Sequence, residues 1–164
     1  GIVLLVLALL GLFVGISSCV STAISIARDI DGPLHRAQVA ASPTEMTRFL
    51  EYADGQLEGR GFKTGYSSLI IRGLDQDMAE VRANLKRLTA RAYALENLDI
   101  DSTTYQVGLD DLRGTVRELH IDSYGYWIWN KGGIWIGLGA LFALIIGILA
   151  LTIISVAGER RYDE

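Results

Sequence analysis

The side chains that most often carry out chemistry are few in this sequence and stand far apart. The two histidines, His35 and His120, are isolated, and the single cysteine, Cys19, lies inside an apolar run. A zinc site needs three or four ligands at characteristic spacings, and a catalytic nucleophile needs a base beside it. We therefore expect no catalytic residue, no metal site and no cofactor site, and a protein that is not an enzyme.

Two pairs of aspartates resemble the start of a calcium loop. Asp29 and Asp31 precede Gly32, and Asp99 and Asp101 precede Ser102. Neither pair continues into the longer pattern of an EF-hand, which alternates acidic ligands and then requires a glycine. Aspartates at helix ends also satisfy free backbone donors, and this is the role that we expect for both pairs.

The positions of the apolar residues say more about the fold than the polar residues do. Residues 2–27 form a run of 26 without a charge, and residues 134–157 form a second run of 24. As a helix each run exceeds about 35 Å, which is enough to cross a hydrocarbon core of about 30 Å. We expect two transmembrane helices, the first in residues 1–27 and the second in residues 126–157 together with an interfacial aromatic belt, with the lipid bilayer as a partner and structural lipids as compatible ligands. A cleaved signal peptide is the alternative for the first run, because residues 16–19 resemble a bacterial lipobox, but the apolar run continues beyond Cys19.

Charge near the apolar runs predicts how the chain is oriented. Arg160 and Arg161 close the second run, whereas residues 28–131 hold 13 basic and 16 acidic residues, with no basic excess. The positive-inside rule then places both termini in the cytoplasm, with residues 158–164 as a tail and residues 28–125 outside. Aromatic and basic side chains are expected to anchor the chain at the membrane interfaces: Tyr124, Tyr126, Trp127, Trp129, Lys131, Arg160 and Arg161.

The segment between the two runs has the periodicity of helices. Gly32 and Pro33 predict a break after the first span, and Ser42 followed by Pro43 and Glu45 predicts a capped helix over residues 43–58. Apolar residues at heptad spacing predict two further helices over residues 70–97 and 102–121, which a short turn would join as an antiparallel hairpin with a coiled-coil seam. The seam consists of Leu74, Met78, Val81, Leu85, Leu88, Leu95, Tyr105, Leu109, Leu112, Val116 and Leu119. The expected fold is an all-α membrane protein, with two transmembrane helices flanking an extracytoplasmic helical hairpin or bundle.

Small residues recur along both apolar runs and predict close helix packing, because small side chains let helix backbones approach each other in lipid. They are Gly11, Gly15, Cys19, Ala23 and Ala27 in the first run, and Gly133, Gly137, Gly139, Ala143 and Gly147 in the second. The second run carries two such rows, Gly133 with Gly137 and Gly139 with Ala143 and Gly147. A two-span protein needs one face per helix for its own packing, so the spare row favours contact with another protein.

These features favour a non-catalytic accessory or scaffolding subunit of a larger membrane complex, which packs through its small-residue faces and its outer hairpin. The expected partners are other membrane subunits, with a homo-oligomer as the less favoured arrangement. A pI near 5.2 and mixed charges give no reason to expect nucleic acid. Two alternatives stay open: a helical-bundle sensor that signals through a separate partner, and a homo-oligomeric structural protein.

Overall fold

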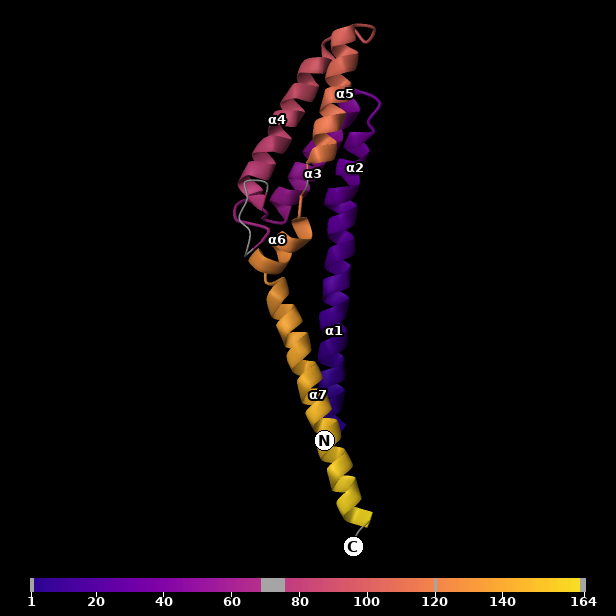
Figure 1. Ribbon diagram of the computed structural model, residues 1–164, viewed down its shortest axis with the longest axis vertical. Helices are drawn as coiled ribbons and strands as arrows, with labels where there is room; N and C mark the ends of the chain where they lie inside the picture. Colours follow the sequence, from indigo (N-terminus) through magenta and orange to yellow (C-terminus); the bar gives the residue numbers. More distant parts are fainter. Residues whose placement is uncertain (1, 69–75, 120, 163–164) are drawn as a thin grey trace. The chain divides into compact units, whose positions relative to one another are not determined.

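The structure is a computed structural model that describes residues 2–68, 76–119 and 121–162, with the backbone alone described at residues 2, 4, 154 and 156–162 (Figure 1). Leu74 of the expected seam and His120 lie outside the described residues, and the side chains of Arg160 and Arg161 are not described. The described residues are helical apart from turns, loops and one isolated bridge between Tyr66 and Asp77. The chain divides into two compact units, which we call the apolar helix pair and the helical domain. The pair consists of Gly1–Ala23 and Gly132–Glu164, and the domain of Ile24–Lys131.

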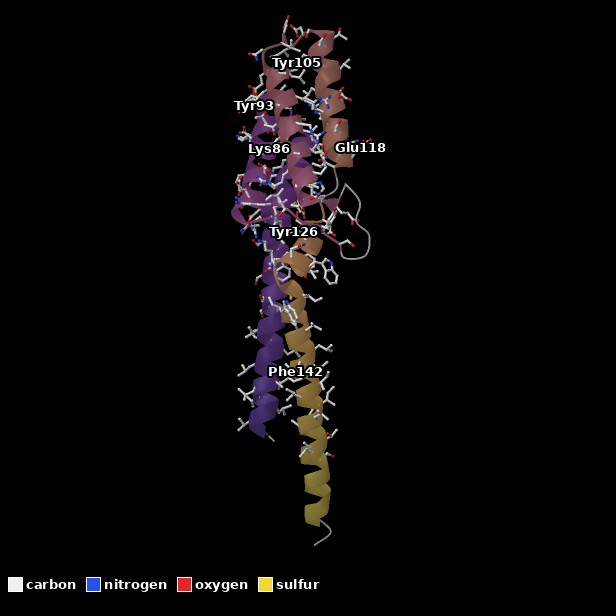
Figure 2. The ribbon with its side chains drawn as sticks, turned by 90° about the vertical axis from the view of Figure 1, so that its left-hand side faces the viewer. Lys86, Tyr93, Tyr105, Glu118, Tyr126 and Phe142 are labelled. Carbon is white, nitrogen blue, oxygen red and sulfur yellow. The ribbon has the colours of Figure 1, made fainter. Side chains whose placement is uncertain are left out.

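The apolar helix pair contains most of α1 (Ile2–Ile26) and the whole of α7 (Gly133–Tyr162). Both helices are long and apolar enough to cross a membrane. Figure 2 shows that the side chains along α1 and α7 are almost entirely carbon, whereas those of the helical domain carry many oxygen and nitrogen atoms. The exposed large side chains of the pair include Phe13, Trp135 and Phe142, which are 70%, 74% and 65% exposed.

The break expected at Gly32 and Pro33 is absent, and that prediction was wrong. α1 passes through a π-helical turn, η1 (Ala27–Asp31), directly into α2 (Gly32–Gln38). Gly32 has helical torsion angles (φ −57°, ψ −51°), and its N–H donates to the carbonyl oxygen of Ala27. Pro33 stands in the first turn of α2, where a missing N–H costs little, and the π turn before it shifts the hydrogen-bond register. The helical path therefore continues to Gln38.

The third helix of the domain, α3 (Pro43–Gly59), begins at the cap that the sequence indicates. The Ser42 side chain accepts a hydrogen bond from the backbone N–H of Glu45, at 3.2 Å. The Glu45 carboxylate accepts in turn from the N–H of Ala41, at 2.9 Å, one residue earlier than in a standard capping box. Along α3, the apolar stripe of Met46, Leu50, Ala53 and Leu57 is fully buried.

The two heptad helices are α4 (Met78–Glu96) and α5 (Thr103–Glu118), which pack against each other on either side of a short turn. Each also packs against a further helix, α4 against α3 and α5 against α2 (Figure 1). The described seam residues are therefore part of one core to which α2 and α3 also contribute, in place of the expected two-helix coiled coil. Those buried are Met78, Val81, Leu85, Leu88, Tyr105, Leu109, Leu112 and Val116, while Leu95 and Leu119 pack at its edge.

The domain ends with a short helix that the sequence pattern did not separate from the second span. α5 stops at Glu118, and α6 (Ser123–Asn130) begins after Asp122, whose side chain accepts from the N–H of Gly125 at 2.8 Å. Gly132 then adopts a φ of +87°, which favours glycine and breaks the path between α6 and α7. The second apolar helix is thus a separate element that begins at Gly133.

Candidate functional site

The contact between α1 and α7 is made by small residues. A Cβ atom placed on Gly15 would lie 3.1 Å from the Cβ of Ala140, and one on Gly11 would lie 3.5 Å from the Cβ of Ala143. On the other helix, a Cβ on Gly147 would lie 3.5 Å from the Cβ of Ala8. The two backbones approach so closely that side chains larger than alanine would not fit between them.

The other predicted packing residues do not share this contact equally. Among the described residues, and leaving aside the backbone of α7 itself, no heavy atom lies within 4 Å of the Cβ positions of Gly137 and Gly139, although Gly139 was expected in one row with Ala143 and Gly147. Cys19 and Ala23 are half-buried, Ala27 is exposed, and the position of Gly133 is buried. The structure therefore brings Gly11, Gly15, Ala143 and Gly147 together, and leaves Gly137 and Gly139 open.

A polar cluster lies where the apolar residues of α1 end and charged residues begin. Arg60, just after α3, donates from Nη2 to the Ser25 hydroxyl at 2.6 Å and to Asp29 Oδ2 at 2.7 Å. Arg28 donates to Asp29 Oδ1 at 2.8 Å. The Ser25 hydroxyl also donates to Asp29, at 3.3 Å. Through this cluster the end of α3 is fastened to the π turn.

A second arginine joins two helices inside the domain. Arg82 on α4 donates to both oxygens of Asp54 on α3, at 2.6 and 3.1 Å, and to Glu58 at 2.9 Å. The side chains of Arg82 and Asp54 are only 11% and 16% exposed. These carboxylates raise the pKa of Arg82 above its ordinary value, chiefly through the hydrogen bond to Asp54. Arg82 is therefore a permanently charged link between α3 and α4.

The aromatic residues expected at a membrane interface have unequal surroundings. Tyr126 is 3% exposed: its hydroxyl donates to the carbonyl oxygen of Thr64 at 2.5 Å, and its ring lies 4.6 Å from that of Phe62. It is part of the domain core and is not available to lipid. Figure 2 shows it within the domain.

The other predicted anchors whose side chains are described lie nearer the surface. Tyr124 and Trp129 are exposed, Trp127 is half-buried against the core, and Tyr124 stacks on Trp127 with ring centroids 5.6 Å apart. Lys131 is exposed, with its Nζ near Gly61. These four residues keep surface that a membrane interface could contact.

Sequence reasoning missed the polar contacts of Arg60 and Arg82. Their partners lie 31 and 28 residues away in the chain, so no local spacing indicates the contacts. Among the residues that the structure describes, no three histidine, cysteine or acidic side chains are grouped as a metal site would require. His35 is exposed on α2.

The chain was also compared with protein-family models, with curated proteins and with solved structures. None of the three comparisons found a match.

Proposed function

We propose that this protein spans a membrane twice, through α1 and α7, and serves as a non-catalytic accessory subunit of a larger membrane complex. Its helical domain would stand on one side of the bilayer, outside the cytoplasm, with both termini on the cytoplasmic side. The domain would act as a rigid brace for the external part of a partner protein.

The exposure of the two apolar helices is the observation that carries this proposal. In the most apolar stretch of α1 and its helical continuation, only 11% of the residues are buried within the structure. In the most apolar stretch of α7 the buried share is 6%. A core helix of a water-soluble protein would be mostly buried, because exposed apolar surface of this extent is unfavourable in water. Lipid or other transmembrane helices would have to cover what this chain leaves exposed.

The open glycines of α7 support contact with a second protein. α1 covers Ala140, Ala143 and Gly147, whereas no described atom outside the backbone of α7 lies within 4 Å of the Cβ positions of Gly137 and Gly139. Glycine exposes helix backbone, and in lipid such a surface favours the close approach of another helix. The helical domain supports the bracing role, because Arg60 and Arg82 hold its elements together by ion pairs across the fold.

Purification from native membranes through a C-terminal tag, in a mild detergent, would test the accessory role. We expect a fixed set of other membrane polypeptides in stoichiometric amount, identified by mass spectrometry and by native size. Gly137→Leu or Gly139→Leu should reduce their recovery, whereas Ile145→Leu, a swap of equal volume at an exposed position of α7, should not. A homodimer or larger homo-oligomer with no other polypeptide would contradict the accessory role and favour the sensor or structural alternatives.

A further inference from the structure

A cavity lined by three arginines opens beside the π turn. It measures about 360 Å³ and lies between η1, α2 and α3. Arg28, Arg36 and Arg48 contribute its charged walls, and Phe49 and Tyr52 contribute aromatic ones. We refer to it as the arginine cavity. Because every one of these residues belongs to the helical domain, the cavity is formed within one compact unit.

Two of its arginines have weak internal partners. The guanidinium carbons of Arg36 and Arg48 lie 6.0 and 5.0 Å from the centre of the Phe49 ring. The carboxylate nearest Arg48 is Glu45, 4.0 Å away, and this carboxylate also accepts from the backbone of Ala41. Arg36 forms no ion pair with any residue that the structure describes. Both guanidinium groups therefore keep hydrogen-bond donors for an incoming anion.

The single carboxylate of the cavity is already engaged. Asp29 is bound by Arg28 at 2.8 Å and by Arg60 at 2.7 Å, so it does not neutralise Arg36 or Arg48. Three arginines and one aspartate leave two positive charges on the cavity wall. The whole chain, in contrast, has a net charge of −4. This local reversal of charge points to an anionic ligand.

The side chains that line the arginine cavity suit a ligand with a phosphate group and an adjoining apolar part. Guanidinium groups bind phosphate oxygens in pairs with good geometry, and they hold this charge at any physiological pH. The rings of Phe49 and Tyr52 offer apolar surface beside the charges. We propose that the arginine cavity binds the phosphate headgroup of an anionic phospholipid.

The position of the cavity along the helix favours lipid over a free phosphate compound. Arg28 follows the last residue of α1 by two positions, about 3 Å along the helix axis, and Arg36 follows by about 15 Å. The polar layer of one bilayer leaflet is roughly 5–8 Å thick, and a long arginine side chain can reach back toward it. This step rests on the proposed membrane insertion of α1.

The test uses the full chain, purified in neutral detergent and reconstituted into vesicles of phosphatidylcholine alone or with phosphatidylglycerol. Native mass spectrometry of protein released from mixed vesicles would report which lipids stay bound. We expect retained phosphatidylglycerol in the unmodified chain and a roughly ten-fold loss of its preference over phosphatidylcholine in Arg36→Gln/Arg48→Gln. Lys86→Gln/Arg117→Gln removes the same charge from exposed positions outside the cavity and should keep the preference.

Three results would overturn the assignment. The first is equal retention of the two lipids by the unmodified chain. The second is equal loss in the cavity variant and the charge-matched control, which would indicate a diffuse charge effect. The third comes from thermal unfolding of the detergent-purified chain. Equal stabilisation of the chain by inorganic phosphate alone and by phosphatidylglycerol would indicate a soluble phosphate ligand. A chain that fails to enter phosphatidylcholine vesicles at all would instead contradict the proposed function, so the two failures are distinguishable.

Discussion

At the scale of single residues, Arg82 and Asp54 form the least exposed ion pair among the residues that the structure describes. A bidentate arginine–carboxylate pair with little solvent exposure loses much more when one partner is removed than a surface pair does, because the remaining charge stays poorly solvated. Arg82 lies in such a pair with Asp54, and it keeps a second partner in Glu58. Its contribution can be measured by removing one carboxylate at a time.

We predict that Asp54→Ala lowers the free energy of unfolding by about 2 kcal/mol, less than for a fully buried pair because Glu58 remains. Asp111→Ala breaks the exposed pair with Arg91 and should change it by no more than about 0.5 kcal/mol. Unfolding of the full chain in mild detergent, followed by circular dichroism, would measure both. Equal effects of the two substitutions would contradict the assigned role of Arg82.

A second residue-scale prediction concerns the ionisation of Tyr93. Its hydroxyl donates to Glu51 at 2.9 Å, and this hydrogen bond raises the pKa of Tyr93 above its ordinary value of 10.0. The protonated phenol is thus favoured in the folded state. The stability that it contributes is present below pH 10 and is lost as the pH rises through the higher folded-state value.

We predict that the near-ultraviolet difference titration of the unmodified chain against Tyr93→Phe gives a pKa above that of a free tyrosine. Glu51→Gln should move this pKa back toward 10, because the negative charge that opposes phenolate formation is removed. A Tyr93 pKa that is the same with and without the Glu51 carboxylate would rule out the hydrogen bond as its cause.

At the scale of elements, the decisive contact is the one between α1 and α7. Gly15 and Ala140 leave no room for a larger side chain, whereas Gly137 faces open space. We predict that Gly15→Leu moves the two helices apart by roughly 2 Å, within the range that side-chain size gives to helix packing. Gly137→Leu, the same substitution at an open position, should leave their distance unchanged.

Pulsed electron paramagnetic resonance between spin labels at Phe13 and Phe142, in a Cys19→Ala background, would measure this distance. Both positions are exposed, so the labels themselves should not disturb the contact. An unchanged distance distribution in Gly15→Leu, or an equal shift in both variants, would contradict the small-residue contact.

The helices of the domain could be predicted from sequence where local rules decide them. The cap at Ser42 and the heptad spacing of α4 and α5 are local patterns, and the structure has helices at those positions. The continuation of α1 through Pro33 could not be foreseen from the usual effect of proline, because a π turn accommodates it. The sequence also could not show that α2 and α3 pack on the heptad helices α4 and α5, because α2 and α5 are about seventy residues apart in the chain.

The candidate site was predictable only in part, for a related reason. Residue type and spacing pointed to Gly11, Gly15, Ala143 and Gly147, but the direction in which α7 faces α1 decided that Gly139 stays open. The arginine cavity gave no sequence signal, because Arg28, Arg36 and Arg48 come together only when α3 folds against α2. Long-range packing, which no local spacing encodes, is the common cause.

At the scale of the whole molecule, the two units differ in which surface they expose. The apolar helix pair exposes its apolar side chains, whereas the helical domain buries its own apolar core and contains the arginine cavity. In water the first unit would be an aggregation hazard, whereas in a bilayer the same surface is solvated by lipid. The central claim is therefore that α1 and α7 both cross a membrane and that the domain stands on the opposite side from the C-terminus.

Cysteine labelling in sealed native vesicles tests this claim most directly. In a Cys19→Ala background, single cysteines would replace Asn97 in the turn after α4 and Leu144 on α7, or be appended after Glu164. We predict that an impermeant maleimide reaches Asn97→Cys and the appended cysteine from opposite sides of the membrane, and that Leu144→Cys stays unlabelled in intact vesicles. Labelling of Asn97→Cys and the appended cysteine from one side, or labelling of Leu144→Cys as fast as Asn97→Cys, would contradict a double crossing by α1 and α7.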